Sequence, residues 1–387
     1  MPAQVDADFS TETVDQLQAA AAHAMAAAGA PGAIVGVWAP WSGEWVAGLG
    51  TQKPAGAGSA VSTDQQFKAA QVTRAMTCDV LYRLAGQGVV ALDDPVTKYV
   101  TGVADMSEVT LGELCDGTAG IGSYSGQLLS TWLSMPERVW NPRELASYGL
   151  GLARTQPGTA FRDSDAGYVL LGLALEHASD STAAELISEQ VATPLGLSAT
   201  RLPADGAELP SSMLAGYLSQ RDAAGAANCA EPLDITKLST STGYTDAGVV
   251  TDIRDLGRYA QALAADALVP ADTDRLDGAL PAYDGAPAWY TTRGGVYQAG
   301  SLIGQSGAVP GYATAAFADP ASGLTVAVVL NNSAAGSGMA LALAWELAAI
   351  ASKAPAAPGQ TAPEAGLPWT AQQYHDAITG SAICPIP

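Results

Sequence analysis

Hydrophobic and polar positions follow a helical period at the start of the chain and strand-like runs soon afterwards. Residues 11–29 form an alanine-rich helical pattern that ends at a Gly-Ala-Pro-Gly break. Two apolar runs, 33–38 and 44–49, flank the turn signal 40–43. This spacing predicts an N-terminal helix followed by an antiparallel hairpin.

The middle of the chain has mainly helical periodicity. In residues 73–84, apolar side chains recur at helical spacing, and glycines follow the segment. Four further segments also predict helices: 110–116, 143–154, 166–178 and 182–192. This region is therefore expected to be mostly α.

Strand patterns return late in the sequence. The runs 300–305, 313–318 and 324–330 are rich in small and β-branched residues, and the last two flank the turn 319–323. A Leu- and Ala-rich helix is expected over 339–350.

The order of these elements predicts an α+β fold, an α/β sandwich in which one antiparallel sheet is flanked by helices. A single domain would span 1–352, with an α/β lobe formed by 10–62 and 240–352 and an inserted α lobe over 63–239. Residues 353–387 are expected to form an Ala/Pro-rich C-terminal arm. A cleft between two lobes is a common place for a ligand site.

Composition excludes several classes of function. Among 387 residues, 48% are hydrophobic and 14% charged, which is typical of a globular protein. The net charge of −21 would repel nucleic acids and anionic membrane surfaces. No apolar run is long enough to span a membrane. We expect no nucleic-acid partner, no membrane span and no cofactor.

Four cysteines bear on the compartment. Their even number, without C-x-x-C spacing or neighbouring histidines, disfavours zinc and permits two disulfides or four buried thiols. The sequence starts without the basic and apolar regions of a signal peptide, so the protein is either cytosolic or exported with its signal removed. The cysteines favour export, and no metal site is predicted.

Several local strings resemble one family. Residues 88–99 (GVVALDDPVTKY) are similar to its G-x-L-x-L-D-D-P-V-x-K-Y segment, and 109–114 to V-T-I-x-x-L-L. Residues 157–172 resemble P-G-x-x-F-x-Y-S-N-x-x-Y-x-L-L-G, and 247–256 resemble A-G-G-L-x-S-T-x-x-D-L. The chain thus resembles, from about residue 12 to 352, the serine β-lactamase and penicillin-binding-protein superfamily, in the branch of class C β-lactamases, DD-peptidases and related esterases. The resemblance implies a β-lactamase/transpeptidase-like fold.

The three motifs that carry chemistry in that family are altered. Its S-x-x-K becomes Gln71-Val72-Thr73-Arg74, its Y-x-N becomes Asp163-Ser164-Asp165, and its H-x-G becomes Gln305-Ser306-Gly307. In the family, the serine attacks the substrate, the lysine helps to deprotonate it, and the strand motif contacts the ligand. The motif-equivalent positions here are therefore Gln71, Arg74, Asp163, Asp165 and Gln305, with Ser306 and Gly307 at the ligand wall.

Each replacement removes a chemical role. Gln71 offers no nucleophilic oxygen, and Arg74 cannot lose a proton to act as a base. Asp163 would be ionised unless burial raises its pKa. An ion pair of Arg74 with either Asp163 or Asp165 would replace the original network.

Neighbouring groups do not obviously take over the nucleophilic role. The nearby hydroxyls are those of Thr73, Thr77, Ser164 and Ser306, and no histidine or lysine is placed to activate them. The three histidines, His23, His177 and His375, all fall outside the motifs.

The resemblance also implies a disulfide. In related proteins the short helix that ends at Cys115 packs against the helix that carries Cys78, so we expect these two cysteines to pair. The bond would close a loop of about 38 residues and stabilise the fold by ~3–4 kcal/mol. Cys229 and Cys384 then pair by elimination, and two disulfides favour an exported protein.

Four aromatic residues are expected at the cleft. Tyr124 would lie at its rim, and Tyr244, Trp289 and Tyr290 would line the opposite side. Tyr124 follows a loop in which Asp116 replaces the family's histidine. The pocket would be polar and partly acidic, which suits amides, sugars or cationic groups better than a carboxylate.

Two functional hypotheses follow. The favoured one is a non-hydrolytic pseudoenzyme that binds a small molecule, a peptide, a peptidoglycan-like ligand or a protein partner. The alternative is an enzyme of altered mechanism, a hydrolase, lyase or isomerase that uses Asp163 or Asp165 with Arg74 and forms no acyl-enzyme. The sequence does not predict an oligomeric state.

Overall fold

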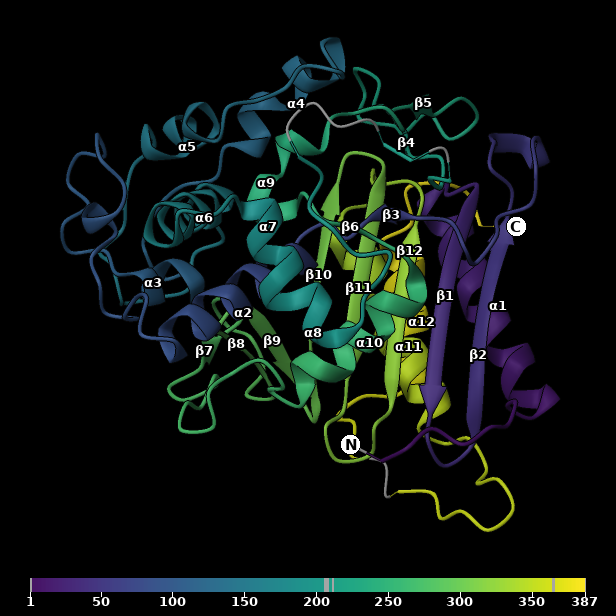
Figure 1. Cartoon of the computed structure of the whole chain (residues 1–387). Coiled ribbons are helices and arrows are strands. Elements are labelled where there is room, and N and C mark those ends of the chain that lie inside the picture. The colour runs from purple at the N-terminus through teal and green to yellow at the C-terminus, as the bar shows by residue number, and fades with distance from the viewer. Residues whose placement is uncertain (1, 205–208, 211, 364–365, 387) are drawn as a thin grey trace.

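One antiparallel sheet of eight strands forms the centre of the molecule, in the order β2-β1-β12-β11-β10-β9-β8-β7. The computed structural model describes residues 2–204, 209–210, 212–363 and 366–386. The predicted hairpin is confirmed as β1 (Gly32–Ala39) and β2 (Gly43–Gly50), and β1 also pairs with β12 (Thr325–Leu330). The late strands are β10 (Leu302–Val309) and β11 (Tyr312–Ala318). Residues near the two ends of the chain thus share one sheet (Figure 1).

The edge of the sheet contains three strands that sequence analysis missed. These are β9 (Val296–Ala299), β8 (Tyr290–Arg293) and β7 (Leu280–Pro281). Strands of two to four residues give too short a hydrophobic pattern to separate from loops. The turn between β8 and β9 is formed by Gly294 and Gly295, both at positive φ.

Helices cover both faces of the sheet (Figure 1). On one face lie α1 (Thr11–Ala28), α11 (Ser337–Ala351) and α12 (Ala371–Gly380), around a core that includes Val35 and Val328. On the other face lie α2 (Val72–Gly86) and α10 (Ile253–Ala264). Alternate residues along a strand point to opposite sides of the sheet, so the strands contribute side chains to a hydrophobic cluster on each face.

An α-rich region is inserted between the N-terminal hairpin and the later strands. Its first helices are α3 (Leu111–Cys115), α4 (Ser125–Ser134), α5 (Pro142–Leu150) and α6 (Asp165–Ser179). The expected helix over 182–192 is divided into α7 (Ala183–Ile187), a π-turn over Ser188–Ala192, and α8 (Thr193–Leu195). The region ends with α9 (Tyr244–Ala247). Two short sheets pair β3 (Phe67–Lys68) with β6 (Val250–Thr251), and β4 (Tyr217–Leu218) with β5 (Leu233–Asp234).

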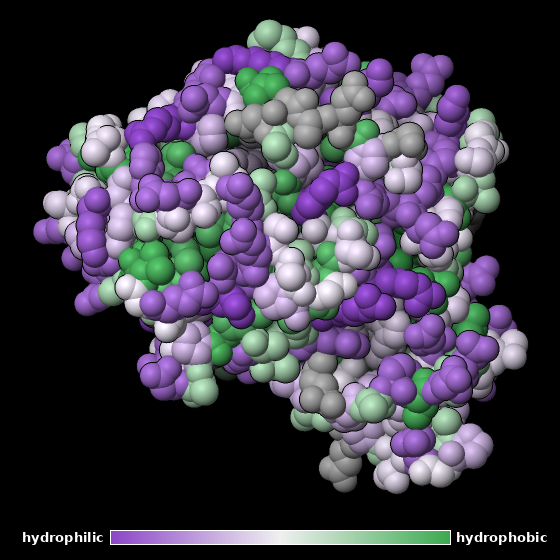
Figure 2. Space-filling model, viewed as in Figure 1, coloured by the Kyte–Doolittle hydropathy of each residue, from purple (hydrophilic) through white to green (hydrophobic). Residues whose placement is uncertain are grey.

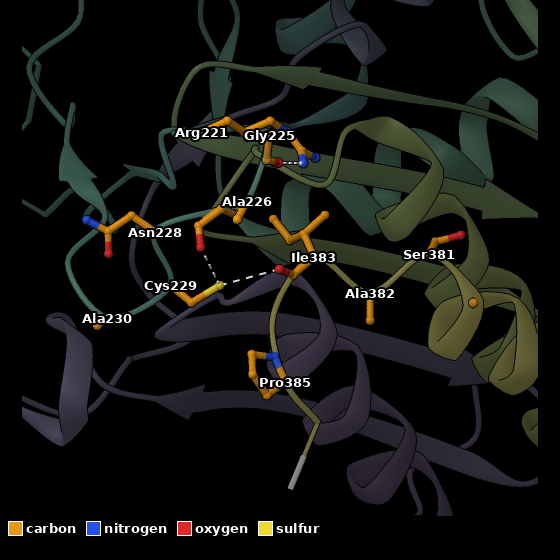
Figure 3. A pocket seen from close by; sticks show the side chains of 12 residues that line it. Arg221, Gly225, Ala226, Asn228, Cys229, Ala230, Ser381, Ala382, Ile383 and Pro385 are labelled. Carbon is orange, nitrogen blue, oxygen red and sulfur yellow. Dashed lines mark hydrogen bonds between the residues drawn. The ribbon is translucent and has the colours of Figure 1, made fainter. Parts of the chain in front are cut away.

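Both expected disulfides are present. Cys78 on α2 is bonded to Cys115 at the end of α3. Cys229 is bonded to Cys384, which fastens the C-terminal arm to the body. Figure 3 shows the Cys229 side chain directed towards the chain at Ile383, in a pocket lined by residues from both segments.

The C-terminal arm is less extended than its composition suggests. Residues 354–363 contain no helix or strand, and residues 364 and 365 lie outside the described part. Trp369 then packs against Trp345 of α11, and Thr370 caps α12 with its side chain. The expectation of a simple extended arm overlooked this terminal helix.

The surface carries both hydrophilic and hydrophobic regions. The face in Figure 2 is largely hydrophilic, although hydrophobic residues gather over the side that carries α6. Within the described residues, no helix combines the length and the apolar character needed to cross a membrane.

Candidate functional site

The start of α2 carries Gln71 and Arg74, the residues expected at the first motif position. The short strand β3 leads through Ala70, whose φ of 50° is left-handed, into Gln71 as the N-terminal flanking residue of the helix. A non-glycine residue in this conformation is uncommon and is held by its surroundings. The turn places Gln71 and Arg74 on one side of the helix start.

Arg74 is the centre of a buried ion-pair network. Its Nη1 donates to Oδ1 of Asp163, and its Nε lies 2.7 Å from Oδ1 of Asp246. Its guanidinium group also lies 4.8 Å from the ring centre of Tyr168, within the range of a cation–π contact. Of the two ion pairs expected for Arg74, the pair with Asp163 is present.

Asp165 bonds to the backbone, whereas the second ion pair expected for Arg74 would have placed the Asp165 carboxylate beside the guanidinium group. Its Oδ1 accepts a hydrogen bond from the backbone N–H of Tyr124 at 2.6 Å, and its Oδ2 accepts one from Ser125 at 2.9 Å. The carboxylate thus fixes the start of α4. Ser164 caps α6 through the N–H of Gly167.

The charges of the network are coupled. Burial alone would lower the pKa of Arg74, but Asp163 and Asp246 raise it well above its usual value, so the side chain remains protonated. Burial raises the pKa of Asp246 to about 7, against the opposing effect of Arg74. A fixed cation between two carboxylates cannot serve as a proton acceptor.

We predict a pH dependence of stability from Asp246. Because its pKa is raised in the folded protein, the native state binds this proton more tightly, and the stability that it contributes is greatest below about pH 4. This contribution should fall by up to roughly 1.4 kcal/mol per pH unit as the pH rises from about 4 to 7. Denaturant unfolding of Asp246→Asn should therefore show a flatter profile than wild type over this range. The exposed substitution Asp15→Asn is the control, and equal slopes in all three proteins would contradict the prediction.

Strand β10 forms the wall beside Gln71. A Cβ added to Gly307 would lie 2.5 Å from the backbone nitrogen of Gln71 and closer still to its side-chain oxygen. Only glycine allows this approach. Ser306 is buried next to it, so Gln71, Ser306 and Gly307 are brought together as the motifs predicted.

Gln305 is turned into the fold. Its Nε2 donates to the carbonyl of Gly295 at 2.8 Å, and its Oε1 accepts from the backbone N–H of Ser306. A Cβ on Gly295 would lie 3.1 Å from the carbonyl oxygen of Arg74, so this turn packs directly on α2. The amide of Gln305 therefore joins the β8–β9 turn to β10. Asp116 holds the same turn by accepting from the N–H of Gly294 at 2.9 Å.

The other hydroxyls of the motif region are bonded to the backbone. Thr73 accepts from the N–H of Val249, and Thr77 donates to the carbonyl of Thr245. Among the described residues, the three histidines lie elsewhere: His23 and His375 stack on each other at α1 and α12, and His177 contacts Arg143. None of them is beside these hydroxyls.

The expected aromatic lining requires correction. Tyr124 is only 1% exposed and donates its hydroxyl to the carbonyl of Thr242, so it is a core residue and does not lie at a rim. Trp289 and Tyr290 pack with Trp345 of α11, on the face of the sheet opposite to α2. Tyr244 is buried at the start of α9, two residues before Asp246.

Sequence reasoning missed Asp246 and Tyr168. Asp246 is the only charged residue in 238–251, and a single carboxylate in such an apolar and hydroxyl-rich run is a signal for a buried, paired group. Tyr168 lies within the segment 157–172, and its resemblance to the family string predicts no contact with Arg74.

Relatives were found by sequence and by structure. A D-alanyl-D-alanine-carboxypeptidase/endopeptidase AmpH from Escherichia coli K12 is 30% identical over 144 residues, which is 35% of this chain. The matched region spans only 37% of that protein.

Solved structures with the same fold cover more of the chain. A D-stereospecific amidohydrolase from Streptomyces sp. has a TM-score of 0.72 at 22% identity, over 84% of this chain and 98% of that one. A D-amino acid amidase from Ochrobactrum anthropi SV3 has a TM-score of 0.69 at 19% identity, over 83% of this chain and 92% of that one. These similarities show a β-lactamase/transpeptidase-like fold.

A family model extends the similarity over most of the chain. The model named Beta-lactamase matches residues 17–350, which include the sheet, the α-rich region and the Arg74 network. The chain belongs to the Beta-lactamase family.

Proposed function

We propose that this protein is a ligand-binding member of its family that does not form an acyl-enzyme. The observation that carries the proposal is the Arg74 network, in which a fixed cation stands where catalysis requires a base and Gln71 stands where it requires a nucleophile. An acyl-enzyme needs a hydroxyl or thiol and a group that removes its proton. Neither group is supplied by these two positions.

The arrangement is coordinated across the motifs. Reversing Gln71 to serine alone would leave Arg74 protonated between Asp163 and Asp246, so position 74 would still supply no base. The loss of acyl-enzyme chemistry therefore depends on Arg74 as well as on Gln71. The glycine at 307 allows β10 to pack closely against Gln71.

The charge of the site indicates a ligand class. Arg74 contributes one positive charge, and Asp163 and Asp246 contribute two carboxylates, of which Asp163 has a side chain that is 64% exposed. A compact amide that carries an ammonium group fits this balance better than an anionic β-lactam. The amidase from Ochrobactrum anthropi has been solved with L-phenylalanine amide and with D-phenylalanine. We therefore propose a small amino-acid amide or peptide-like ligand.

A second candidate keeps some catalysis. The exposed carboxylate of Asp163, held by Arg74, favours a proton-transfer role without an acyl-enzyme. Asp165 is less suited to this role because both of its oxygens are bonded to backbone amides. Amide or ester hydrolysis that is lost in Asp163→Asn and kept in Ser306→Ala would favour this candidate.

The location of the protein is part of the proposal. Two disulfides in the structure support an oxidising compartment outside the cytoplasm.

Binding and labelling of the full chain test the proposal together. We expect D-phenylalanine amide to bind reversibly in isothermal titration calorimetry, about tenfold or more weakly in Asp163→Asn and unchanged in Asp15→Asn. A fluorescent penicillin should leave no covalent label on any of the three proteins. Failure of the amide to bind overturns the ligand class, and labelling of the wild type overturns the absence of an acyl-enzyme.

A further inference from the structure

Two histidines and a glutamate meet where the C-terminal helix packs on the body, away from the Arg74 network. His23 lies on α1, Glu346 on α11 and His375 on α12. One ligand atom from each lies within 4.8 Å of the other two. The three helices contact one another in pairs on the same face of the sheet (Figure 1).

The carboxyl group of Glu346 is buried, and one of its two oxygens is unsatisfied within the described residues. It is 4% exposed, and its Oε1 lies 3.0 Å from Nδ1 of His375. Its Oε2 is buried and makes no hydrogen bond to any described residue. Leaving such an atom unpaired in the interior costs free energy, so a proton, a water molecule or a cation is expected there.

The three helices supply no other cation. α1, α11 and α12 contain no lysine and no arginine. The two imidazoles are therefore the only groups on these helices that can offer Glu346 a positive charge or offer a metal ion a nitrogen lone pair. The two rings are stacked, with centres 3.8 Å apart. Two protonated rings at this separation would repel each other strongly.

His23 also has an unused nitrogen. Its Nε2 lies 3.1 Å from the hydroxyl of Thr379, and its Nδ1 is buried with no hydrogen-bond partner among the described residues. One neutral imidazole, one further imidazole and one carboxylate form a donor set that suits a transition metal better than calcium or magnesium.

We propose that His23, Glu346 and His375 form a zinc site that fastens α12 to α1 and α11. Zinc commonly takes three protein ligands of this kind and a water molecule in the fourth position. Ligand atoms around a tetrahedral zinc lie roughly 3.3 Å apart, so the side chains must shift by about 1 Å. The two stacked rings must also turn so that their in-plane lone pairs converge on the ion. His375 is 40% exposed, which provides both the freedom to move and a path for the ion.

The site would act on the arm and not on the proposed ligand. It lies on the face of the sheet opposite to α2, and the Cys229–Cys384 bond already ties down the end of the same arm. A metal at His375 would add a second attachment at the helix itself, so zinc should reduce the fraying of α12.

Zinc binding to the full chain, after removal of metals with a chelator, tests the proposal. Equilibrium dialysis with elemental analysis should find one zinc per chain with a dissociation constant in the micromolar range or below. His23→Asn and Glu346→Gln should each weaken binding by roughly 100-fold or more, since even outer-shell changes cost 10–100-fold. His177→Asn, which changes the histidine outside the cluster, should bind as wild type does.

A second measurement locates the effect and is independent of any activity. Hydrogen exchange should show that saturating zinc protects the amides of α12 in wild type and in His177→Asn, and gives no protection in Glu346→Gln. Circular dichroism checks that each variant is folded. The proposal is overturned by no stoichiometric binding at 100-fold molar excess of zinc, or by equal binding in folded Glu346→Gln and wild type.

Discussion

Replacing Arg74 by methionine should lower the free energy of unfolding by about 3–5 kcal/mol, because it leaves the buried carboxylate of Asp246 without its cation. Methionine fills a similar volume, so the loss reports mainly on charge. Without Arg74 the pKa of Asp246 should rise further, and the loss should therefore be larger at pH 8 than at pH 5. Denaturant unfolding at the two pH values measures both effects.

A surface arginine provides the matched control. Arg254 is 52% exposed and lies 3.7 Å from Glu44, so Arg254→Met should cost at most about 1 kcal/mol. A loss of about 1 kcal/mol or less in Arg74→Met would show that the network contributes little to stability, and would remove the physical reason for regarding it as fixed.

The second large effect is expected from the Cys78–Cys115 disulfide. The bond joins residues 37 apart in sequence, and both cysteines are buried in the core beneath the Arg74 network. Substituting both by alanine should lower the free energy of unfolding by about 3–4 kcal/mol through the loss of a constraint on the unfolded chain. Thermal and denaturant unfolding of the double variant check this value.

The other disulfide should behave differently. The Cys229–Cys384 bond holds a terminal arm, so its double alanine variant should increase hydrogen exchange in α12, whereas the Cys78–Cys115 double variant should not. Equal hydrogen exchange of α12 in the two double variants would contradict this distinction.

The sequence was sufficient for the main architecture. Apolar runs identified β1, β2, β10, β11 and β12, because strands of six to eight residues are long enough to show a hydrophobic pattern. Of these, β1, β11 and β12 are buried throughout. Strands β7, β8 and β9 were missed since two to four residues carry no clear period. Helix α12 was missed because the Ala/Pro-rich segment before it dominated the composition.

The candidate site was only partly predictable. The motif positions brought Gln71, Arg74, Asp163 and Gly307 together, but Asp246 lies 172 residues from its partner Arg74 and belongs to no motif considered. Tyr124 was placed at a rim because loop position says little about burial, and the structure puts it in the core. The cluster of His23, Glu346 and His375 depends on the packing of three distant helices, which no local spacing reveals.

Mass spectrometry of the intact protein after prolonged exposure to a penicillin and to a D-amino acid ester tests the central claim most directly. We predict an unchanged mass, because Gln71 has no oxygen nucleophile and Arg74 remains protonated. A mass increase equal to one acyl group, mapped to a hydroxyl such as Ser306 and abolished in the corresponding alanine variant, would contradict the account.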